Sequence, residues 1–133
     1  MSVEVCFCCS GKAFEVCCKP FIDGIRKPGS AEELMRSRYS AYATLAVDYI
    51  IQTTHISTRK QYNSKSIREW AGTSRWLKLE VLNMQEGTEN DSSGKVEFKA
   101  YFKDAFGINH VHHEYSTFAK ENKIWFFVEG TVS

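Results

Sequence analysis

The chain has 133 residues, with 17 basic and 16 acidic side chains and a formal net charge of +1. A chain of this length fits one domain that buries a hydrophobic core of its own. The near-neutral charge and the scattered basic residues disfavour nucleic acid and membrane surfaces as partners. No apolar run approaches the ~20 residues needed to span a bilayer, so we expect a soluble protein.

Cysteines are confined to a short segment near the amino terminus. All five lie between Cys6 and Cys18, as a Cys6-x-Cys8 pair with Cys9 beside it and a Cys17-Cys18 pair. With a Ser-Gly-Lys turn between them, the two pairs give four thiolates that can close a tetrahedron around one metal ion. Such a site suits Zn²⁺, which has no electronic preference for another geometry. We therefore expect zinc as a cofactor, bound by a segment that spans residues 1–20.

Disulfide bonds and an iron–sulfur cluster are the alternatives to zinc. Disulfides belong mainly to secreted chains and spread their cysteines over the fold, whereas residues 1–5 carry no secretory signal pattern. The cysteine spacing matches no common ferredoxin pattern. Clustered thiols without an export signal favour a metal site, and they favour the cytoplasm as the compartment.

The next segment, residues 21–29, is predicted to be a connector because prolines and glycines punctuate it. Ser30 and Glu33 then form the pattern of a capping box, which predicts a helix from Ala31 to about Ala46. One face of this helix is mainly apolar, yet it includes Arg38. A buried guanidinium must be paired or must face a cavity, since an unpaired buried charge is very costly.

Two shorter helices are expected after the first. Asp48 is a candidate N-cap for a helix through residues 49–52, and a polar loop with His55 at its start comes next. Ser64 predicts the start of a third helix, which ends near Trp70.

The second half of the chain changes to a strand pattern. Strands are expected over residues 76–84, 96–102, 108–119 and 124–129, with polar turns between them. The second of these shows the alternation of apolar and polar side chains that is typical of a half-buried strand. Helices followed by an antiparallel meander predict an α+β domain over residues 30–133, with the helices packed on one face of the sheet.

The cysteine segment resembles a known motif. Cys6-x-Cys8-x-Ser10-Gly11-Lys12 followed by Cys17-Cys18 is similar to the SEC-C zinc motif, best known from the carboxyl-terminal tail of the preprotein translocase ATPase. The resemblance implies that the zinc ligands are Cys6, Cys8, Cys17 and Cys18. It also implies a protein partner, because the translocase motif docks a chaperone.

Cys9 departs from this motif, which normally has glycine at that position. Glycine there suggests a backbone conformation that a residue with a Cβ adopts only at some cost. Cys9 is then a tolerated turn residue, a spare thiol or a substitute ligand, and we favour the first interpretation.

The chain from Cys6 to Gly130 also resembles the YchJ family of uncharacterised bacterial proteins. Beyond the cysteines, the matching motifs are Leu34-Met35-Arg36-Ser37-Arg38-Tyr39-Ser40-Ala41-Tyr42, Asp48-Tyr49-Ile50, Thr54-His55, His113-Glu114-x-Ser116-x-Phe118 and Trp125-x-x-Val128-x-Gly130. The resemblance implies a cone-shaped nuclear-transport-factor-two-like (cystatin-like) fold, with helices cupped by a curved antiparallel sheet. It transfers no activity, because the family has none that is settled.

A curved sheet closed by helices leaves a concave pocket at its open end. Glu114, Ser116 and Phe118 share one face of their strand with His110 and His112. Arg38 could then pair with Glu114, either as a structural ion pair, which we favour, or as part of an active site with Glu114 as base. The pocket candidates are Arg38, Tyr39, Tyr42, Glu114, Ser116 and Phe118, and the catalytic candidates are Glu114, Arg38 and His55.

Two hypotheses of function follow from these patterns. The first is a zinc-binding adaptor, in which the knuckle (residues 1–20) binds a protein partner and the cone-shaped domain serves as scaffold or as a homodimer surface through its sheet. The second is a small-molecule-binding protein or enzyme that uses the pocket around Glu114 and Arg38, which rests on analogy with related folds.

Overall fold

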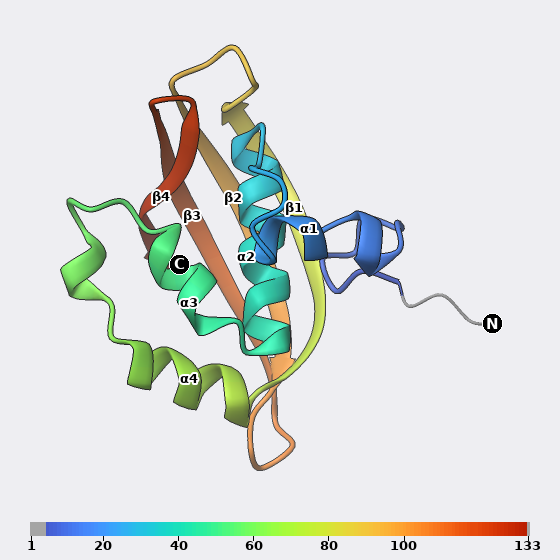
Figure 1. Ribbon diagram of the computed structural model, residues 1–133. Helices are drawn as coiled ribbons and strands as arrows, with labels where there is room; N and C mark the ends of the chain where they lie inside the picture. Colours follow the sequence, from blue (N-terminus) through green and yellow to red (C-terminus); the bar gives the residue numbers. More distant parts are fainter. Residues whose placement is uncertain (1–4, 133) are drawn as a thin grey trace.

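Helices fill the first half of the chain and strands the second, as Figure 1 shows for the computed structural model, which describes residues 5–132. The first four residues of the predicted zinc-binding segment and the last residue of the predicted α+β domain lie outside these. The elements are η1 (Phe14–Val16), α1 (Lys19–Ile22), α2 (Ala31–Thr44), α3 (Val47–Gln52), η2 (Arg59–Gln61), α4 (Ser64–Thr73), β1 (Arg75–Glu86), β2 (Ser93–Lys103), β3 (Asn109–Glu121) and β4 (Ile124–Val132). The predicted α+β class is confirmed.

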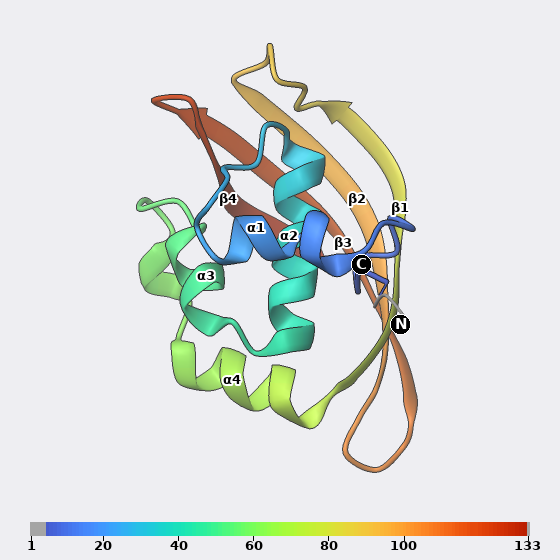
Figure 2. The ribbon, with the colours of Figure 1, turned by 45° about the vertical axis from the view of Figure 1, so that its right-hand side comes forward.

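The strands form one four-stranded antiparallel sheet in the order β1-β2-β3-β4. The sheet curves strongly, and the helices lie on its concave side (Figure 2). Irregular register accompanies the curvature: β1 shifts against β2 between Trp76 and Lys78 and between Val81 and Asn83, and β3 shifts against β4 at Thr117–Phe118. Irregularities of this kind bend a strand and increase its twist.

Helix α2 lies along the concave face and supplies much of the core, including buried Leu34 and Tyr39. Its start is capped by Ser30, whose Oγ accepts a hydrogen bond from the Glu33 N–H at 3.1 Å. The Glu33 carboxylate in turn accepts one from the Gly29 N–H at 2.7 Å. The predicted capping pattern is confirmed, with the return hydrogen bond made to the residue before the N-cap.

The start of α2 docks against the end of the β1–β2 hairpin. The Ala31 N–H donates to the Gly87 carbonyl at 2.9 Å. Gly87 has a φ of +77°, and a Cβ on Gly94 would collide with the backbone of Gly87. Two glycines therefore allow the hairpin to close tightly where α2 begins.

The boundary between α2 and α3 differs from the prediction. Helix α2 ends at Thr44, because Leu45 adopts a left-handed φ of 62° and reverses the chain. The N-cap position of α3 is then Ala46, which makes no side-chain capping hydrogen bond, and Asp48 lies in the first turn. The prediction that Asp48 is the N-cap is wrong; its carboxylate lies instead where the helix dipole favours a negative charge.

Helix α4 begins and ends differently from the prediction as well. Asn63, rather than Ser64, is the N-cap, and its Oδ1 accepts two N–H groups of the first turn at 2.8 and 3.1 Å. The helix continues past Trp70 to Thr73. The Thr73 hydroxyl donates to the Glu69 carbonyl at 2.7 Å, which satisfies a carbonyl of the last turn.

The alternation predicted for the second strand is confirmed in β2, where Val96, Phe98 and Ala100 are buried. The turn between β3 and β4 places Asn122 and Lys123 at φ values of 50° and 68°. Positive φ at both central residues is the geometry of the two-residue turns that suit hairpin twist. The hairpin therefore closes without an intervening loop.

The loop between α3 and α4 covers the outer edge of β4. The His55 N–H donates to the Phe127 carbonyl at 2.7 Å, and the Phe127 N–H donates to the Thr53 carbonyl at 2.8 Å. The Thr58 hydroxyl donates to the Val128 carbonyl at 2.6 Å. These bonds satisfy an edge that would otherwise expose unpaired backbone groups, and they bring the end of α3 to the concave face.

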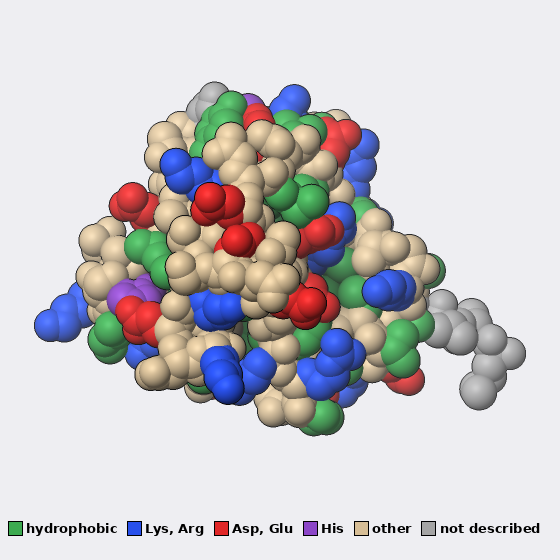
Figure 3. Space-filling model, turned by 90° about the horizontal axis from the view of Figure 1, so that it is seen from above, with side chains coloured by type: hydrophobic (Ala, Val, Ile, Leu, Met, Phe, Trp, Pro, Cys, Tyr) green, Lys and Arg blue, Asp and Glu red, His purple; other side chains and the backbone are tan. Residues whose placement is uncertain are grey.

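The outer surface carries charges of both signs. Figure 3 shows acidic and basic side chains interspersed on the face seen from above, with small apolar areas between them. Within residues 5–132, no helix combines the length and the apolar character that crossing a bilayer demands.

The cap of α2 is open to a direct test. We expect Ser30→Ala to lower the free energy of unfolding by about 1 kcal/mol, because the Glu33 N–H loses its acceptor. The matched control is Ser66→Ala, at an exposed helical position of α4, where the change should stay within about 0.5 kcal/mol. Urea denaturation measures both, and equal effects of the two substitutions would contradict the capping role.

Candidate functional site

Four of the cysteines form a compact cluster. The Sγ atoms of Cys6, Cys8, Cys17 and Cys18 all lie within 4.8 Å of one another. Cys17 Sγ lies 3.7 Å from Cys8 Sγ and 3.9 Å from Cys18 Sγ. Four sulfurs placed about 2.3 Å from a central Zn²⁺ would be about 3.8 Å apart. The cluster therefore has the size of a tetrahedral sulfur site and could bind a metal ion.

The thiols affect one another's protonation. Hydrogen bonds from Cys18 and Cys8 lower the pKa of Cys6, and the same contact with Cys6 raises the pKa of Cys18. Close thiols cannot all ionise together unless a cation offsets their charge. This set of donors is the one expected of a metal site, whose ligands must be deprotonated.

Cys9 lies outside the cluster. Its φ of 65° is in the left-handed region, where the glycine usual at this position of the motif costs less strain. Its Sγ accepts a hydrogen bond from the Leu79 N–H of β1 at 3.4 Å. These features fit the interpretation of Cys9 as a turn residue.

The cluster packs directly against α2. Cys6, Cys8 and Cys18 are buried. Cys6 Sγ lies 3.5 Å from Ser40 Oγ, and Arg36 donates through Nη1 to the Cys8 carbonyl at 2.7 Å. The cysteine segment is thus continuous with the domain core, where the sequence alone suggested an appendage.

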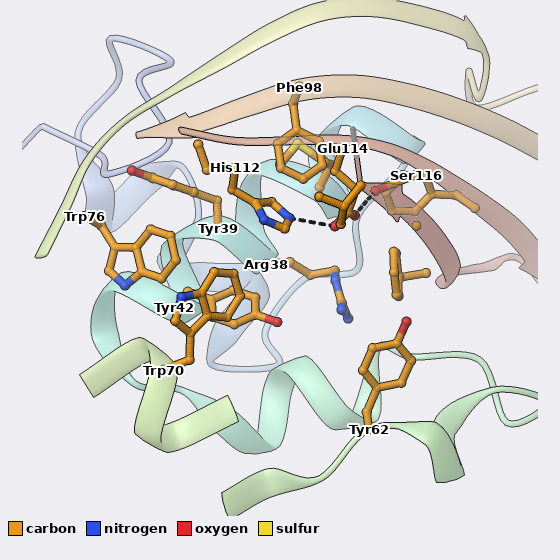
Figure 4. Close-up of a pocket in the computed structure, with 16 residues that line it drawn as sticks. Arg38, Tyr39, Tyr42, Tyr62, Trp70, Trp76, Phe98, His112, Glu114 and Ser116 are labelled. Atoms are coloured by element: carbon orange, nitrogen blue, oxygen red, sulfur yellow. Dashed lines mark hydrogen bonds and ion pairs between the residues drawn. The ribbon is translucent and has the colours of Figure 1, made fainter. Parts of the chain in front are cut away.

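A second site lies inside the curve of the sheet. A cavity of about 270 Å³ opens between α2, α4 and the concave faces of β2 and β3 (Figure 4). Its walls are mainly aromatic and include three tyrosines and two tryptophans. The lining residues are Met35, Arg38, Tyr39, Tyr42, Tyr62, Trp70, Trp76, Phe98, Ala100, His112, Glu114, Ser116, Phe118, Phe127, Gly130 and Val132.

Arg38 enters the cavity from α2 and is only 7% exposed. Its Nη1 donates to the Ile50 carbonyl at 2.8 Å and to the hydroxyls of Thr53 and Thr54 at 2.7 and 3.3 Å. The guanidinium carbon lies 4.4 Å from the ring centre of Phe127. Burial lowers the pKa of Arg38, yet arginine stays charged in proteins.

The predicted contact between Arg38 and Glu114 is wrong. The two side chains line the same cavity, but each takes other partners. The end of α3 reaches the guanidinium first, and Glu114 is bound by neighbours on its own strand. His112 Nε2 lies 2.8 Å from Glu114 Oε1, and the Ser116 hydroxyl donates to Glu114 Oε2.

Glu114 is ionised in this setting. Burial by itself would raise the pKa of Glu114, but the hydrogen bonds from His112 and Ser116 and the positive charge of Arg38 outweigh it and lower the pKa. Gly130 on β4 leaves the room for this carboxylate, because a Cβ at that position would overlap it.

The other candidates from the sequence divide into two groups. Tyr39, Tyr42, Ser116 and Phe118 line the cavity. His55 does not: its Nε2 lies 2.7 Å from Glu121 Oε1 and its Nδ1 lies 2.7 Å from Ser57 Oγ, in the loop that covers β4.

Several cavity residues were absent from the sequence-based pocket, namely Tyr62, Trp70, Trp76 and His112. His112 had a usable signal, since it shares a strand face with Glu114 and Phe118. Tyr62 and Trp70 had none, because only the packing of the α3–α4 segment against the sheet brings them to the cavity. Burial raises the pKa values of Tyr42 and Tyr62, so both phenols stay protonated as hydrogen-bond donors.

The ionised state of Glu114 predicts a pH dependence of stability. Because the folded-state pKa is lowered, the ionised carboxylate contributes fully above its usual value of 4.5 and loses that contribution as the pH falls through the folded-state pKa. We expect the advantage of the wild type over Glu114→Gln in urea denaturation to shrink in this acidic range. A difference that stays constant from about pH 7 to about pH 3 would contradict the lowered pKa.

Comparison with known proteins identifies relatives along most of the chain. The family described as "YchJ, middle NTF2-like domain" matches residues 30–130. A UPF0225 protein of Geobacter sulfurreducens is 43% identical over 127 residues, which cover 96% of this chain and 78% of the relative. A UPF0225 protein of Haemophilus influenzae is 39% identical over 133 residues, which cover 100% of this chain and 81% of the relative.

Two solved structures resemble the chain in fold. The solution structure of RPA3114, a SEC-C motif-containing protein from Rhodopseudomonas palustris, matches with a TM-score of 0.87 and 41% identity, over 96% of this chain and 98% of that one. The crystal structure of a SEC-C motif-containing protein from Psychrobacter arcticus matches with a TM-score of 0.82 and 33% identity, over 99% of this chain and 84% of that one. The chain therefore belongs to the YchJ (UPF0225) family, and its residues 30–130 correspond to the NTF2-like domain of that family.

Proposed function

We propose that this protein binds a small organic molecule in the cavity between α2, α4 and the sheet. The observation that carries the proposal is the cavity of about 270 Å³, in which aromatic walls surround a buried cation and a buried carboxylate. Small-molecule sites are commonly concave, mostly apolar and equipped with a few converging polar groups. A cone filled by its own side chains would have opposed this function.

The polar groups of the cavity support the proposal further. Arg38 and Glu114 are both largely buried, with side chains directed into one space (Figure 4). A scaffold that needed only stability would be better served by apolar side chains at such positions, because desolvating separate charges is costly. Charges kept apart in a cavity are typical of a site that recognises a ligand.

For the cysteine cluster we propose a structural zinc ion. The four Sγ atoms are spaced as a tetrahedral zinc site requires. With all four positions taken by protein thiolates, the ion has no open position for a substrate. Zinc would then hold the cysteine segment against α2, whose other face forms a wall of the cavity.

The adaptor hypothesis stays a prediction, as does a homodimer through the sheet. Three of the four clustered cysteines are buried, and only Cys17 is partly exposed. This packing favours a structural role for the cluster, which leaves the cavity as the better-supported functional site.

Filling the cavity tests ligand binding. Ala100 is buried on β2 and lines the cavity, so Ala100→Phe should place its ring in the ligand's space. We expect a fragment library, followed through the NMR signals of the Trp70 and Trp76 indoles, to yield hits on the wild type that bind Ala100→Phe at least about tenfold more weakly. The buried Trp125 indole, outside the cavity, serves as an internal reference.

The matched control is Val111→Phe, which adds a ring to an exposed position on β3. Its neighbour His112 lines the cavity, so Val111 projects from the opposite face of the sheet. This variant should bind the same hits as the wild type. The proposal would be wrong if no fragment moved the Trp70 or Trp76 signals, or if Ala100→Phe kept wild-type affinity.

Elemental analysis of purified protein tests the zinc proposal. We expect one zinc ion per chain, retained in Cys9→Gly and lost in Cys17→Ser, because only Cys17 belongs to the cluster. Chelation should raise hydrogen exchange first in residues 5–22, while β2 and β3 keep their protection. Another metal in stoichiometric amount, or equal loss of zinc in both variants, would contradict the proposal.

A further inference from the structure

The cavity holds two opposite charges that are not paired with each other. Arg38 uses only Nη1 for its hydrogen bonds, and all of these go to uncharged acceptors. Its Nε and Nη2 make no hydrogen bond to any residue within 5–132. A buried guanidinium commonly has its donors occupied, so two unused donor groups beside a cavity point to an acceptor supplied by a ligand.

Glu114 offers the complementary group. Each of its oxygens accepts one hydrogen bond, from His112 and from Ser116. A carboxylate has about four acceptor positions in all. Glu114 can therefore accept a further hydrogen bond from a donor in the cavity.

The charges of the cavity restrict the ligand's own charge. With an uncharged His112, the charges of Arg38 and Glu114 sum to zero. A ligand with a net charge would lose its hydration in this enclosed space with no unmatched counter-charge to receive it. The site therefore favours an uncharged ligand that satisfies both groups.

The walls restrict the ligand's shape. Trp70 and Trp76 lie with their ring centres 5.2 Å apart and meet Tyr42 at 5.4 and 5.7 Å. Aromatic walls of this kind favour flat rings, which gain from stacked or edge-to-face contacts. The polar groups lie across the cavity from these rings, as Figure 4 shows.

We propose that the cavity selects a flat, uncharged ring compound that carries a carbonyl oxygen next to an N–H or O–H group. The carbonyl oxygen accepts hydrogen bonds from Arg38 Nε and Nη2, and the adjacent donor binds Glu114. This ligand class rests on the proposed binding function and adds to it the pattern of recognition.

The test uses flat bicyclic probes that differ in one group each. 2-Quinolone has a carbonyl beside an N–H, N-methyl-2-quinolone lacks the donor, and quinoline lacks both the carbonyl and the N–H. We expect 2-quinolone to bind at least about tenfold more tightly than either control, since a buried polar group left unpaired discriminates strongly. NMR titration should show its binding both at the Trp70 and Trp76 indoles and at the Arg38 Nε–H signal.

A pair of variants assigns the donor's partner. Glu114→Gln should reduce the preference for 2-quinolone over N-methyl-2-quinolone to about twofold or less, because the amide accepts more weakly than the carboxylate. The matched control is Glu97→Gln, since Glu97 is bound to His113 at 2.7 Å much as Glu114 is bound to His112. Glu97 does not line the cavity, so this variant should keep the full preference.

The outcomes separate the two proposals. If all three probes move the Trp70 and Trp76 signals with equal affinity, the cavity binds small molecules but the recognition pattern is wrong. If 2-naphthoate, an anion of the same outline, binds more tightly than 2-quinolone, the site prefers a charged ligand and the inference is also overturned. If fragments of every kind leave these signals unmoved, the proposed binding function itself fails.

Discussion

The packing of α2 against the concave face of the sheet is the contact on which both sites depend. The helix buries Leu34 and Tyr39 in the core, while Arg36 and Ser40 meet the cysteine segment. One helix is therefore a wall of the cavity and also the support of the four-cysteine cluster. Its position is set at the start by the close approach of Gly87 and Gly94, which admits no side chain, and a metal ion that secures the cysteine segment would act on the cavity through this helix.

A second constraint keeps the cavity open. Arg38 is tied through Nη1 to the end of α3, and Glu114 is tied to His112 and Ser116 on its own strand. Because each charge already has partners on its own side, the two do not collapse into a direct ion pair across the space. Gly130 leaves room for the carboxylate. Charges held apart in this way are less stable than a packed apolar core, and proteins commonly accept such a loss of stability where a site must bind something.

Local patterns predicted the type of each element and failed mainly at the ends of helices. Ser30 was identified as a cap because a carboxylate follows at the right spacing. At α4 two neighbouring polar residues could both have been the cap, and the backbone geometry of Asn63 decided between them. The turn at Leu45 could not be foreseen, since a left-handed leucine has no sequence signal and persists only because the surrounding packing favours it.

The sequence by itself determined the α+β class, the clustering of the thiols in one short segment and the burial of the helix face that carries Arg38. Each of these depends on spacing along the chain, which the hydrophobic period and the cysteine pattern record directly. Only the tertiary structure decided that Arg38 binds the end of α3 instead of Glu114, and that Tyr62, Trp70 and His112 join the cavity. Those contacts depend on the curvature of the sheet, the register of its strands and the path of the loop over β4, which arise from long-range packing and leave no local pattern in the sequence.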